Sequence, residues 1–437
     1  GLSAWLGTSL HGQITLGQWR THLPYKYCNI AEATNNRVFC STTGGLFYYQ
    51  LEDNSVVKVS KIDGLSDNGI AAMRWSGDLE TLIMAYQNSN IDLIRENVIV
   101  NLPDIMKKQI PGDKYIYDIY YLGQDAYLST GFGIVLLNLE KDEISETYYI
   151  GDNGEALKVN QVTSDDTYLY AATDKGIRRG LIDDPFLVDF NAWETISDIP
   201  NANGAFSAIA YFNNTLYTAL SDPSGVQDRL YYNSGNGWNP YSYFTGKLCH
   251  ELLNQGDYLS LVDNKGVHLI NPDGLIIKEM FSDNPLSSSL DDNGSLWLAD
   301  FGDGLLTNEG GSMWSIIPNG PNTTSVHGME ASGNVLYSVQ GGVTGSWANQ
   351  YLKGYLETFS GEQWESKLVE DVRDLLSLAI DPADPFHVFA GSWGYGLLEF
   401  KGQEVIRYTE ENSSLQTIIA GGDFIRIGGI ALDPVGN

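Results

Sequence analysis

A short phrase recurs along this chain at a nearly constant interval: a strand-like run of Tyr, Leu and Val residues, a tight turn that contains glycine, and a second strand-like run. Neighbouring copies of the turn lie 38 to 45 residues apart, or near double that distance where one copy has diverged. This spacing is typical of the four-stranded blade of a β-propeller. The turn glycines are Gly45, Gly133, Gly176, Gly266, Gly304 and Gly396, and Asn90 occupies the same place in one further copy.

Nine copies of the strand before the turn can be aligned. Each is preceded by another strand that ends in a polar hairpin, where Asn tolerates the positive φ of a two-residue turn. Several copies continue into a strand that begins with Trp; we interpret these rings as packing between blades, with ligand stacking as the alternative. The pattern predicts an all-β protein made of four-stranded propeller blades. The aligned strands are 37–40, 81–84, 126–129, 168–171, 215–218, 257–260, 295–298, 334–337 and 386–389.

The number of copies predicts more than one ring, because a single propeller usually has four to eight blades. We predict a lead-in over 1–15 that retains the end of a signal peptide, a first propeller of about seven blades over 16–311, and the start of a second propeller over 312–437 that stops inside a blade. One larger or irregular ring is the alternative. A strand around Trp19 precedes the first blade, so we expect it to pair with the last blade and close the first ring.

The charge balance restricts the partners. The chain has 55 acidic and 25 basic residues and a formal net charge of −30, which repels phosphate backbones, so we exclude nucleic acid. Much of the acidic excess lies in hairpin turns, where solvated carboxylates keep a protein soluble. Calcium binding in those turns is the alternative. No segment approaches the roughly 20 apolar residues of a membrane span, so we expect no membrane span in this chain.

The sequence contains no complete catalytic or metal-binding motif of the familiar kinds. The six histidines show neither the i, i+4 pairing nor the cysteine spacing of a metal site. The chain lacks a Gly-x-Ser-x-Gly elbow and a glycine-rich loop leading into a helix. Residues 292–297 resemble part of the Asp-box of sialidases, but we interpret them as a blade hairpin. We therefore predict no catalytic residue, no metal and no cofactor, although paired carboxylates could converge from separate blades.

Three cysteines, Cys28, Cys40 and Cys249, are too few for a disulfide framework. Counting outward from the first polar hairpin places Cys40 opposite Ala31 and Cys28 opposite Thr43. The two cysteines are then not paired, and a bridge between them needs an irregular bend. We therefore expect buried free thiols.

Two sets of motifs carry a family resemblance. Residues 291–297 (DDNGSLW), followed by 302–305 (GDGL), are similar to the regulator-propeller repeat in the periplasmic halves of Bacteroidetes hybrid two-component sensors. The N-terminal region resembles the PorZ family, which are surface propeller proteins of the type IX secretion system. The segments of this second resemblance are 19–25 (WRTHLPY), 44–49 (GGLFYY), 63–67 (DGLSD), 90–94 (NIDLI) and 131–135 (GFGIV).

The PorZ resemblance implies an exported surface protein with two propellers and a C-terminal sandwich domain. It also implies that the protein functions together with the sortase-like attachment complex of the secretion system and binds anionic lipopolysaccharide. We therefore predict a non-enzymatic adaptor, periplasmic or at the cell surface, with protein partners and lipopolysaccharide or another glycan as ligand. A glycan-sensing ectodomain of a hybrid two-component system is one alternative, and a propeller enzyme acting on polysaccharide is another.

Exposed loop aromatics are the candidates for a glycan site, because sugars stack on aromatic rings and propellers bind ligands where inter-strand loops converge. Trp347 lies in a polar insertion at 341–350, and Trp393 and Tyr395 lie in the glycine-rich turn at 391–396. All three lie outside the strand positions that pack blades. The alternative is that their rings pack against a further blade.

Overall fold

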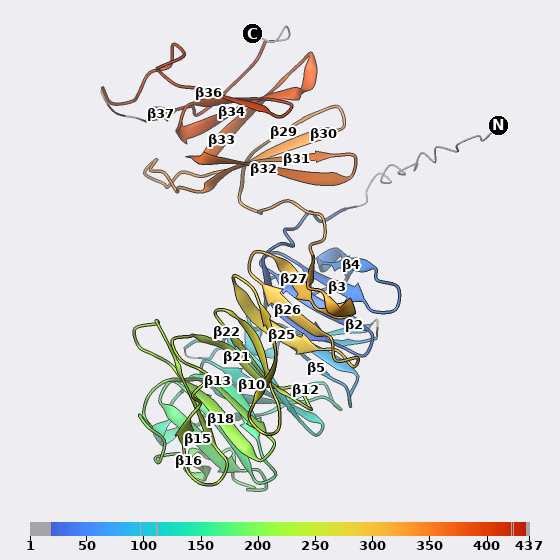
Figure 1. The fold of residues 1–437 in the computed structure, drawn as a ribbon, viewed down its shortest axis with the longest axis vertical. Coiled ribbons are helices and arrows are strands. Elements are labelled where there is room, and N and C mark those ends of the chain that lie inside the picture. Colours follow the sequence, from blue (N-terminus) through green and yellow to red (C-terminus); the bar gives the residue numbers. More distant parts are fainter. Residues whose placement is uncertain (1–18, 97, 111, 421, 423, 434–437) are drawn as a thin grey trace, which may run out of the picture.

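The computed structural model describes residues 19–433 except 97, 111, 421 and 423, so the predicted lead-in over 1–15 lies outside the described residues. Within the described residues the chain forms nine antiparallel sheets, and each sheet has a main path of four strands in which consecutive strands pair (Figure 1). This confirms the prediction of four-stranded propeller blades. The one α-helix in the described part of the chain, α1 (Asp104–Lys107), is a single turn between two sheets, and it is too short to cross a membrane, as are the short 3₁₀ turns.

Seven of the sheets follow one another from β1 to β28 and form a closed ring. The first strand of each sheet contacts the first strand of the next, and β25 contacts β1, so these seven strands surround a central channel. The strands are β1 (Cys28–Ala33), β2 (Arg37–Thr42), β3 (Leu46–Gln50) and β4 (Val56–Val59); β5 (Ile70–Ser76), β6 (Thr81–Tyr86), β7 (Ile91–Arg95) and β8 (Val98–Leu102); β9 (Ile116–Leu122), β10 (Asp125–Thr130), β11 (Gly133–Asn138) and β12 (Glu143–Tyr148); β13 (Val159–Ser164), β14 (Tyr168–Thr173), β15 (Gly176–Leu181) and β16 (Trp193–Thr195); β17 (Phe206–Phe212), β18 (Thr215–Leu220), β19 (Arg229–Asn233) and β20 (Asn239–Pro240); β21 (Cys249–Asn254), β22 (Leu259–Asp263), β23 (Gly266–Ile270) and β24 (Ile276–Phe281); β25 (Pro285–Leu290), β26 (Leu296–Asp300), β27 (Gly304–Thr307) and β28 (Trp314–Ile316).

Two further sheets lie beside each other and form a second unit. Their first strands, β29 and β33, contact each other, and one apolar cluster that includes Val339, Leu378 and Phe400 fills the space between the sheets. The domain boundaries at 15 and 311 stay a prediction. The strands are β29 (Val326–Ser332), β30 (Val335–Gln340), β31 (Lys353–Ser360) and β32 (Gln363–Arg373); β33 (Leu375–Asp381), β34 (Asp384–Gly394), β35 (Leu397–Lys401) and β36 (Glu404–Tyr408); and β37 (Ile425–Arg426), which pairs with the end of β34.

The recurring glycine lies at or just before the start of the third strand of its blade. A Cβ atom added at Gly133 would lie 2.1 Å from the carbonyl oxygen of Tyr148, at the end of the fourth strand. The same clash with a fourth-strand carbonyl occurs at Gly266 and Gly396, at 2.3 and 2.2 Å. The repeat that predicts the blade is therefore a packing requirement, because only glycine allows the two backbones to approach so closely.

The first ring does not close in the way that the sequence predicts. Residues 19–26 form no strand, and the Trp19 side chain is 82% exposed. The last sheet instead takes all four of its strands, β25–β28, from one continuous segment. The prediction of a closing strand around Trp19 is therefore wrong, because no strand of the last blade is missing.

The first and last blades are joined by hydrogen bonds of polar side chains and by a shared apolar cluster, which close the ring. Ser289 Oγ accepts the Ala33 backbone N–H at 2.9 Å, and Ser287 Oγ accepts that of Ala31 at 3.4 Å. Tyr27 also forms an isolated β-bridge with Phe301. Beneath these contacts, buried residues of the first and last blades share one cluster, which comprises Tyr25, Cys28, Ala31, Ala33, Val38, Cys40, Phe47, Tyr49, Trp297, Ala299, Leu305 and Ile316.

Tryptophans at the fourth strands of the first ring pack between blades, as interpreted from the sequence, whereas Trp364 packs against Phe359 of its own sheet and against His22. Trp193 is buried in a cluster shared by the third and fourth blades. The Trp314 ring lies 5.8 Å, centroid to centroid, from the ring of Tyr49 in the first blade. These rings therefore contribute to the contacts between neighbouring sheets.

The nine first strands share one irregularity, a β-bulge just after the strand begins. In β1 the register shifts between Cys28 and Ile30, so that Cys28 pairs with Thr42 rather than with Thr43 as predicted. The predicted pairing of Cys40 with Ala31 is confirmed. A bulge adds one residue to a strand and redirects its side chain. The bulged residues are Asn29, Ala71, Tyr117, Asn160, Ser207, His250 and Leu286 in the first ring and His327 and Leu376 in the second unit.

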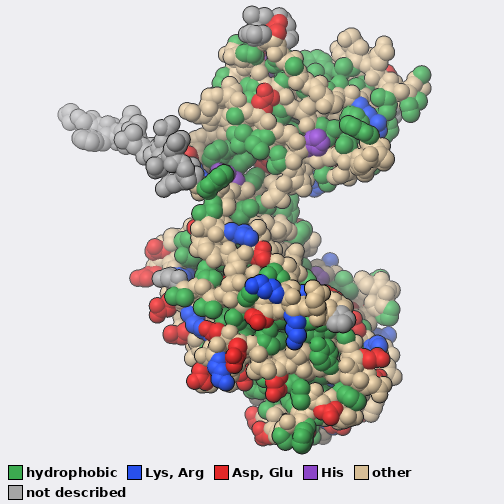
Figure 2. Space-filling model, turned by 180° about the vertical axis from the view of Figure 1, so that it is seen from behind, with side chains coloured by type: hydrophobic (Ala, Val, Ile, Leu, Met, Phe, Trp, Pro, Cys, Tyr) green, Lys and Arg blue, Asp and Glu red, His purple; other side chains and the backbone are tan. Residues whose placement is uncertain are grey.

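The first ring and the second unit, which comprises the sheets β29–β32 and β33–β36, meet at a narrow waist (Figure 2). Acidic side chains are spread over the surface of the first ring (Figure 2). Asn319, in the connection between the units, accepts the Trp364 N–H at 2.8 Å and donates to the Trp364 carbonyl at 2.9 Å. The Trp364 indole donates to His22 Nδ1 at 2.9 Å, and Arg20 forms an ion pair with Glu362. The segment before the first blade therefore contacts the second unit.

Candidate functional site

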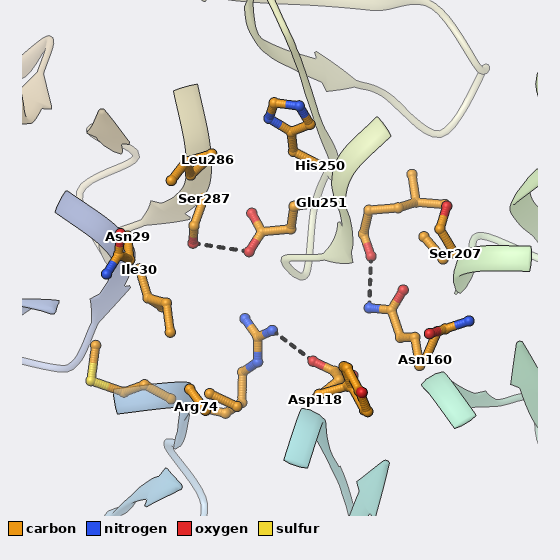
Figure 3. A pocket seen from close by; sticks show the side chains of 17 residues that line it. Asn29, Ile30, Arg74, Asp118, Asn160, Ser207, His250, Glu251, Leu286 and Ser287 are labelled. Atoms are coloured by element: carbon orange, nitrogen blue, oxygen red, sulfur yellow. Dashed lines mark hydrogen bonds and ion pairs between the residues drawn. The ribbon is translucent and has the colours of Figure 1, made fainter. Parts of the chain in front are cut away.

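A cavity of about 270 Å³ lies in the central channel of the first ring, near the start of the first strands (Figure 3). Each of the seven first strands contributes its bulged residue to the lining, which is therefore a direct product of the bulges. The residues that contribute polar groups at this level are Asn29, Tyr117, Asn160, Ser207 and His250. Ser207 Oγ is buried and has no hydrogen-bond partner within the described part of the chain. The cavity is thus suited to a small ligand with hydrogen-bonding groups.

One guanidinium and three carboxylates also lie in the channel. Arg74 on β5 pairs with Glu32 on β1 at 3.3 Å and with Asp118 on β9 at 3.2 Å. Glu251 on β21 lies across the same cavity, where it accepts the Ser287 hydroxyl hydrogen bond (Figure 3). The side chains of Arg74, Glu32 and Asp118 are at most 14% exposed. This cluster is therefore largely shielded from solvent.

Burial raises the pKa of all three carboxyl groups. The pKa of Glu32 reaches about 7, although Arg74 and the hydrogen bond from the Trp75 N–H oppose the rise. Burial also raises the pKa of Asp118 and of Glu251, again against the charge of Arg74. One arginine cannot neutralise three buried carboxylates, so a protonated Glu32 is favoured below neutral pH.

These carboxylates also connect neighbouring blades. Glu32 accepts the backbone N–H of Trp75 at 2.9 Å, and Glu251 accepts that of Ser288 at 2.8 Å. In each pair the donor belongs to the first strand of the next blade. Across residues 19–433, apart from the four positions that the structure leaves out, there is no group of three or more His, Cys, Asp or Glu side chains that could hold a metal ion. The channel is therefore a polar cavity whose buried charges also stabilise the ring.

The sequence did not identify the channel residues, because the bulged residues share a position and not a residue type. Asparagine, alanine, tyrosine, serine, histidine and leucine all occur there. These residues could have been found only by counting residues back from each polar hairpin to the start of the first strand. The bulge inserts one extra residue, so that count is wrong by one.

The structure brings two of the three predicted glycan-site residues together. The rings of Trp347 and Trp393 have centroids 5.6 Å apart, and the Trp393 indole donates to the Trp347 carbonyl at 2.9 Å. The Arg426 guanidinium lies 4.7 Å from the centroid of the Trp393 ring. Tyr395 is half-buried and packs against the apolar cluster of the second unit. The arrangement is thus a pair of tryptophans with an adjacent positive charge.

Trp347 occupies an unusual backbone position. Its side chain is 63% exposed and its φ is +62°, in the left-handed region that normally favours glycine, asparagine or aspartate. A large aromatic residue at such a position costs about 1 kcal/mol or more relative to glycine. An exposed tryptophan with this backbone conformation contributes little to the core.

The closed seven-bladed ring and the two sheets that follow it define a β-propeller protein. Residues 38–194 match the family described as the N-terminal β-propeller domain of PorZ of the type IX secretion system. Over these residues the chain is similar to the PorZ N-terminal propeller. No curated protein sequence matches it.

Solved structures support the same fold. PorZ of Porphyromonas gingivalis, described as an essential bacterial surface component of the type IX secretion system, superposes with a TM-score of 0.83 at 23% identity. The match covers 96% of this chain and 56% of the PorZ chain, so this chain spans just over half of that protein. At this identity the likeness establishes the fold.

Two more distant matches have TM-scores of 0.48 and 12% identity. The β-propeller domain of Cps50 (Swd1) from Myceliophteria thermophila is matched over 68% of this chain and 99% of that domain. The extracellular domain of a protein described as a one-component system from B. thetaiotaomicron is matched over 89% of this chain and 54% of the other.

Proposed function

We propose that this chain is the propeller portion of an exported, non-enzymatic adaptor of a type IX secretion system that binds protein partners at the cell surface. The match of residues 38–194 to the PorZ N-terminal propeller family carries the proposal. The superposition on PorZ over 96% of the chain supports it. A rigid ring that presents many loops on its two faces is well suited to hold partners in a fixed geometry.

The chemistry of the channel supports an adaptor over an enzyme. Glu32 and Glu251 each accept a backbone N–H from the neighbouring blade. Glu32 and Asp118 also share Arg74 as an ion-pair partner. A pair of catalytic carboxyl groups must instead be free to face a substrate.

We also propose that the tryptophan pair of the second unit binds lipopolysaccharide or another anionic glycan. The exposed Trp347 ring offers a face on which a sugar can stack, and Arg426 places a positive charge beside the neighbouring Trp393 ring. A local cation matters in a chain of net charge −30, because the overall charge repels anions.

Deleting the gene in its own bacterium tests the adaptor role. We expect cargo proteins of the secretion system to be lost from the cell surface and restored by the intact gene, measured by protease accessibility and surface labelling. Normal surface display in the deletion strain would contradict the proposal. A change in glycan-dependent transcription with normal secretion would instead support the two-component alternative.

The glycan site is tested in the full-length protein with Trp347→Gly. Glycine fits the left-handed backbone, so the variant keeps or raises the melting temperature, while loss of the stacking face weakens binding to lipopolysaccharide vesicles about tenfold or more. Phe186→Ala, which removes a side chain 70% exposed in the first ring, is the matched control and keeps wild-type affinity. Equal affinities of Trp347→Gly and wild type would remove this site from consideration.

A further inference from the structure

In place of the free thiols that the sequence predicts, we propose that Cys28 and Cys40 form a disulfide bond that fixes the first strand of the ring at the point where the ring closes. Their Sγ atoms lie 2.8 Å apart, and both side chains are 0% exposed. The sulfur atoms of a disulfide lie about 2.05 Å apart. Only a small movement therefore separates the two thiols from the bonded geometry.

The β-bulge at Asn29 is what brings the two thiols together. Cys28 pairs with Thr42, and directly opposed residues of an antiparallel pair project from the same face. Cys40 and Thr42 are two residues apart on β2, so they also share a face. Without the bulge Cys28 would oppose Thr43, and its side chain would lie on the other face of the sheet from Cys40.

The position of the pair gives the bond a structural role. Cys28 follows Tyr27, which bridges to Phe301 of the last blade. Both cysteines also belong to the apolar cluster that the first and last blades share, together with Trp297 and Leu305. A bond to β2 would hold the start of β1 against the last blade, where the closure depends on side-chain contacts. It would also restrict the unfolded chain.

The reaction requires an external disulfide oxidant such as oxidised glutathione. The thiolate of one cysteine attacks the oxidant and releases one glutathione thiol, and the second cysteine then attacks the mixed disulfide and releases the other. The protein loses two hydrogen atoms, and the oxidant becomes two thiols. Burial in the folded blade raises the pKa of Cys40 well above its usual value, so the thiolate is scarce once the blade has packed. The bond therefore forms during folding.

Counting accessible thiols tests the bond directly, and Cys249 provides an internal reference. The full chain is refolded with oxidised glutathione, denatured, treated with iodoacetamide and weighed by mass spectrometry. We expect one modified cysteine, Cys249, and a cross-linked peptide that contains Cys28 and Cys40. Prior reduction gives three modified cysteines. Three modified cysteines without reduction would overturn the proposal.

The role in closure is tested by the stability of the same samples. The oxidised chain should melt several degrees above the reduced chain, because the bond restricts the unfolded state and secures the first strand. Cys40→Ala should abolish this difference and leave two modifiable thiols, whereas Cys249→Ala should keep the difference and leave none. Equal melting temperatures of oxidised and reduced wild type would overturn the role in closure. The thiol count uses the wild-type protein alone, so it does not depend on whether any variant folds.

Discussion

Glu32 illustrates how one buried side chain can serve two blades. It accepts a hydrogen bond from the Trp75 N–H and pairs with Arg74, although it is only 5% exposed. Its burial raises its pKa from an ordinary value of 4.5 to about 7. The folded ring therefore holds the proton of this carboxyl group more tightly than the unfolded chain does.

This difference predicts how the stability of the ring depends on pH. The contribution from the proton on Glu32 is fully present below pH 4.5 and is lost as the pH rises through about 7, because ionisation then becomes unfavourable in the folded state. Glu32→Gln keeps an oxygen for the Trp75 N–H and removes the ionisable group. We expect its melting temperature to fall less than that of wild type between these two pH values, as measured by differential scanning calorimetry. Asp118 and Glu251 are unchanged in the comparison, so parallel curves would contradict the assignment to Glu32.

At the scale of the element, each blade depends on the close approach of its third and fourth strands. Gly133 has a φ of +148°, and the carbonyl of Tyr148 occupies the space that a Cβ atom would need. Gly123 also has a positive φ, +63°, but no atom lies within 4 Å of the Cβ position. Alanine is therefore strained by a positive φ at both positions, and only at Gly133 does it also meet a backbone carbonyl.

Replacement of each glycine by alanine should reveal that difference. We expect Gly133→Ala to lower the free energy of unfolding by about 3 kcal/mol or more, because the fourth strand must move. Gly123→Ala should cost about 1 kcal/mol, the price of a left-handed backbone alone. Urea denaturation of the two variants measures both values. Equal losses would show that the approach of the fourth strand does not account for the recurring glycine.

At the scale of the whole molecule, the contacts at the waist hold the two units in one arrangement. Asn319 makes two hydrogen bonds to the backbone of Trp364, and His22 accepts a third from the indole of the same residue. The pKa of His22 is lowered by its burial and by the charges of Arg20 and Lys58, which keeps the imidazole neutral and able to accept.

Asn319→Ala should loosen this arrangement without unfolding either unit. We expect a larger radius of gyration in small-angle X-ray scattering and faster proteolysis between residues 317 and 325, with unchanged melting of the first ring. Asn412→Ala is the matched control, because Asn412 also makes two hydrogen bonds but only to its own turn, at Arg407 and Thr409. Identical scattering of the two variants would show that Asn319 does not hold the units together.

The sequence by itself determined the blade. Hairpins and strands depend on neighbours within one blade, so the recurring glycine and the alternating strands were sufficient to predict four-stranded sheets and the pairing of Cys40 with Ala31. The tertiary structure alone decided how blades meet. The closure of the ring without a strand at Trp19, the contact of Trp347 with Trp393 and the ring of channel residues all join positions far apart in the chain. A one-residue bulge, which leaves no mark in residue type, redirects Cys28 and the channel side chains, because a shift of one residue in a strand reverses the face of a side chain.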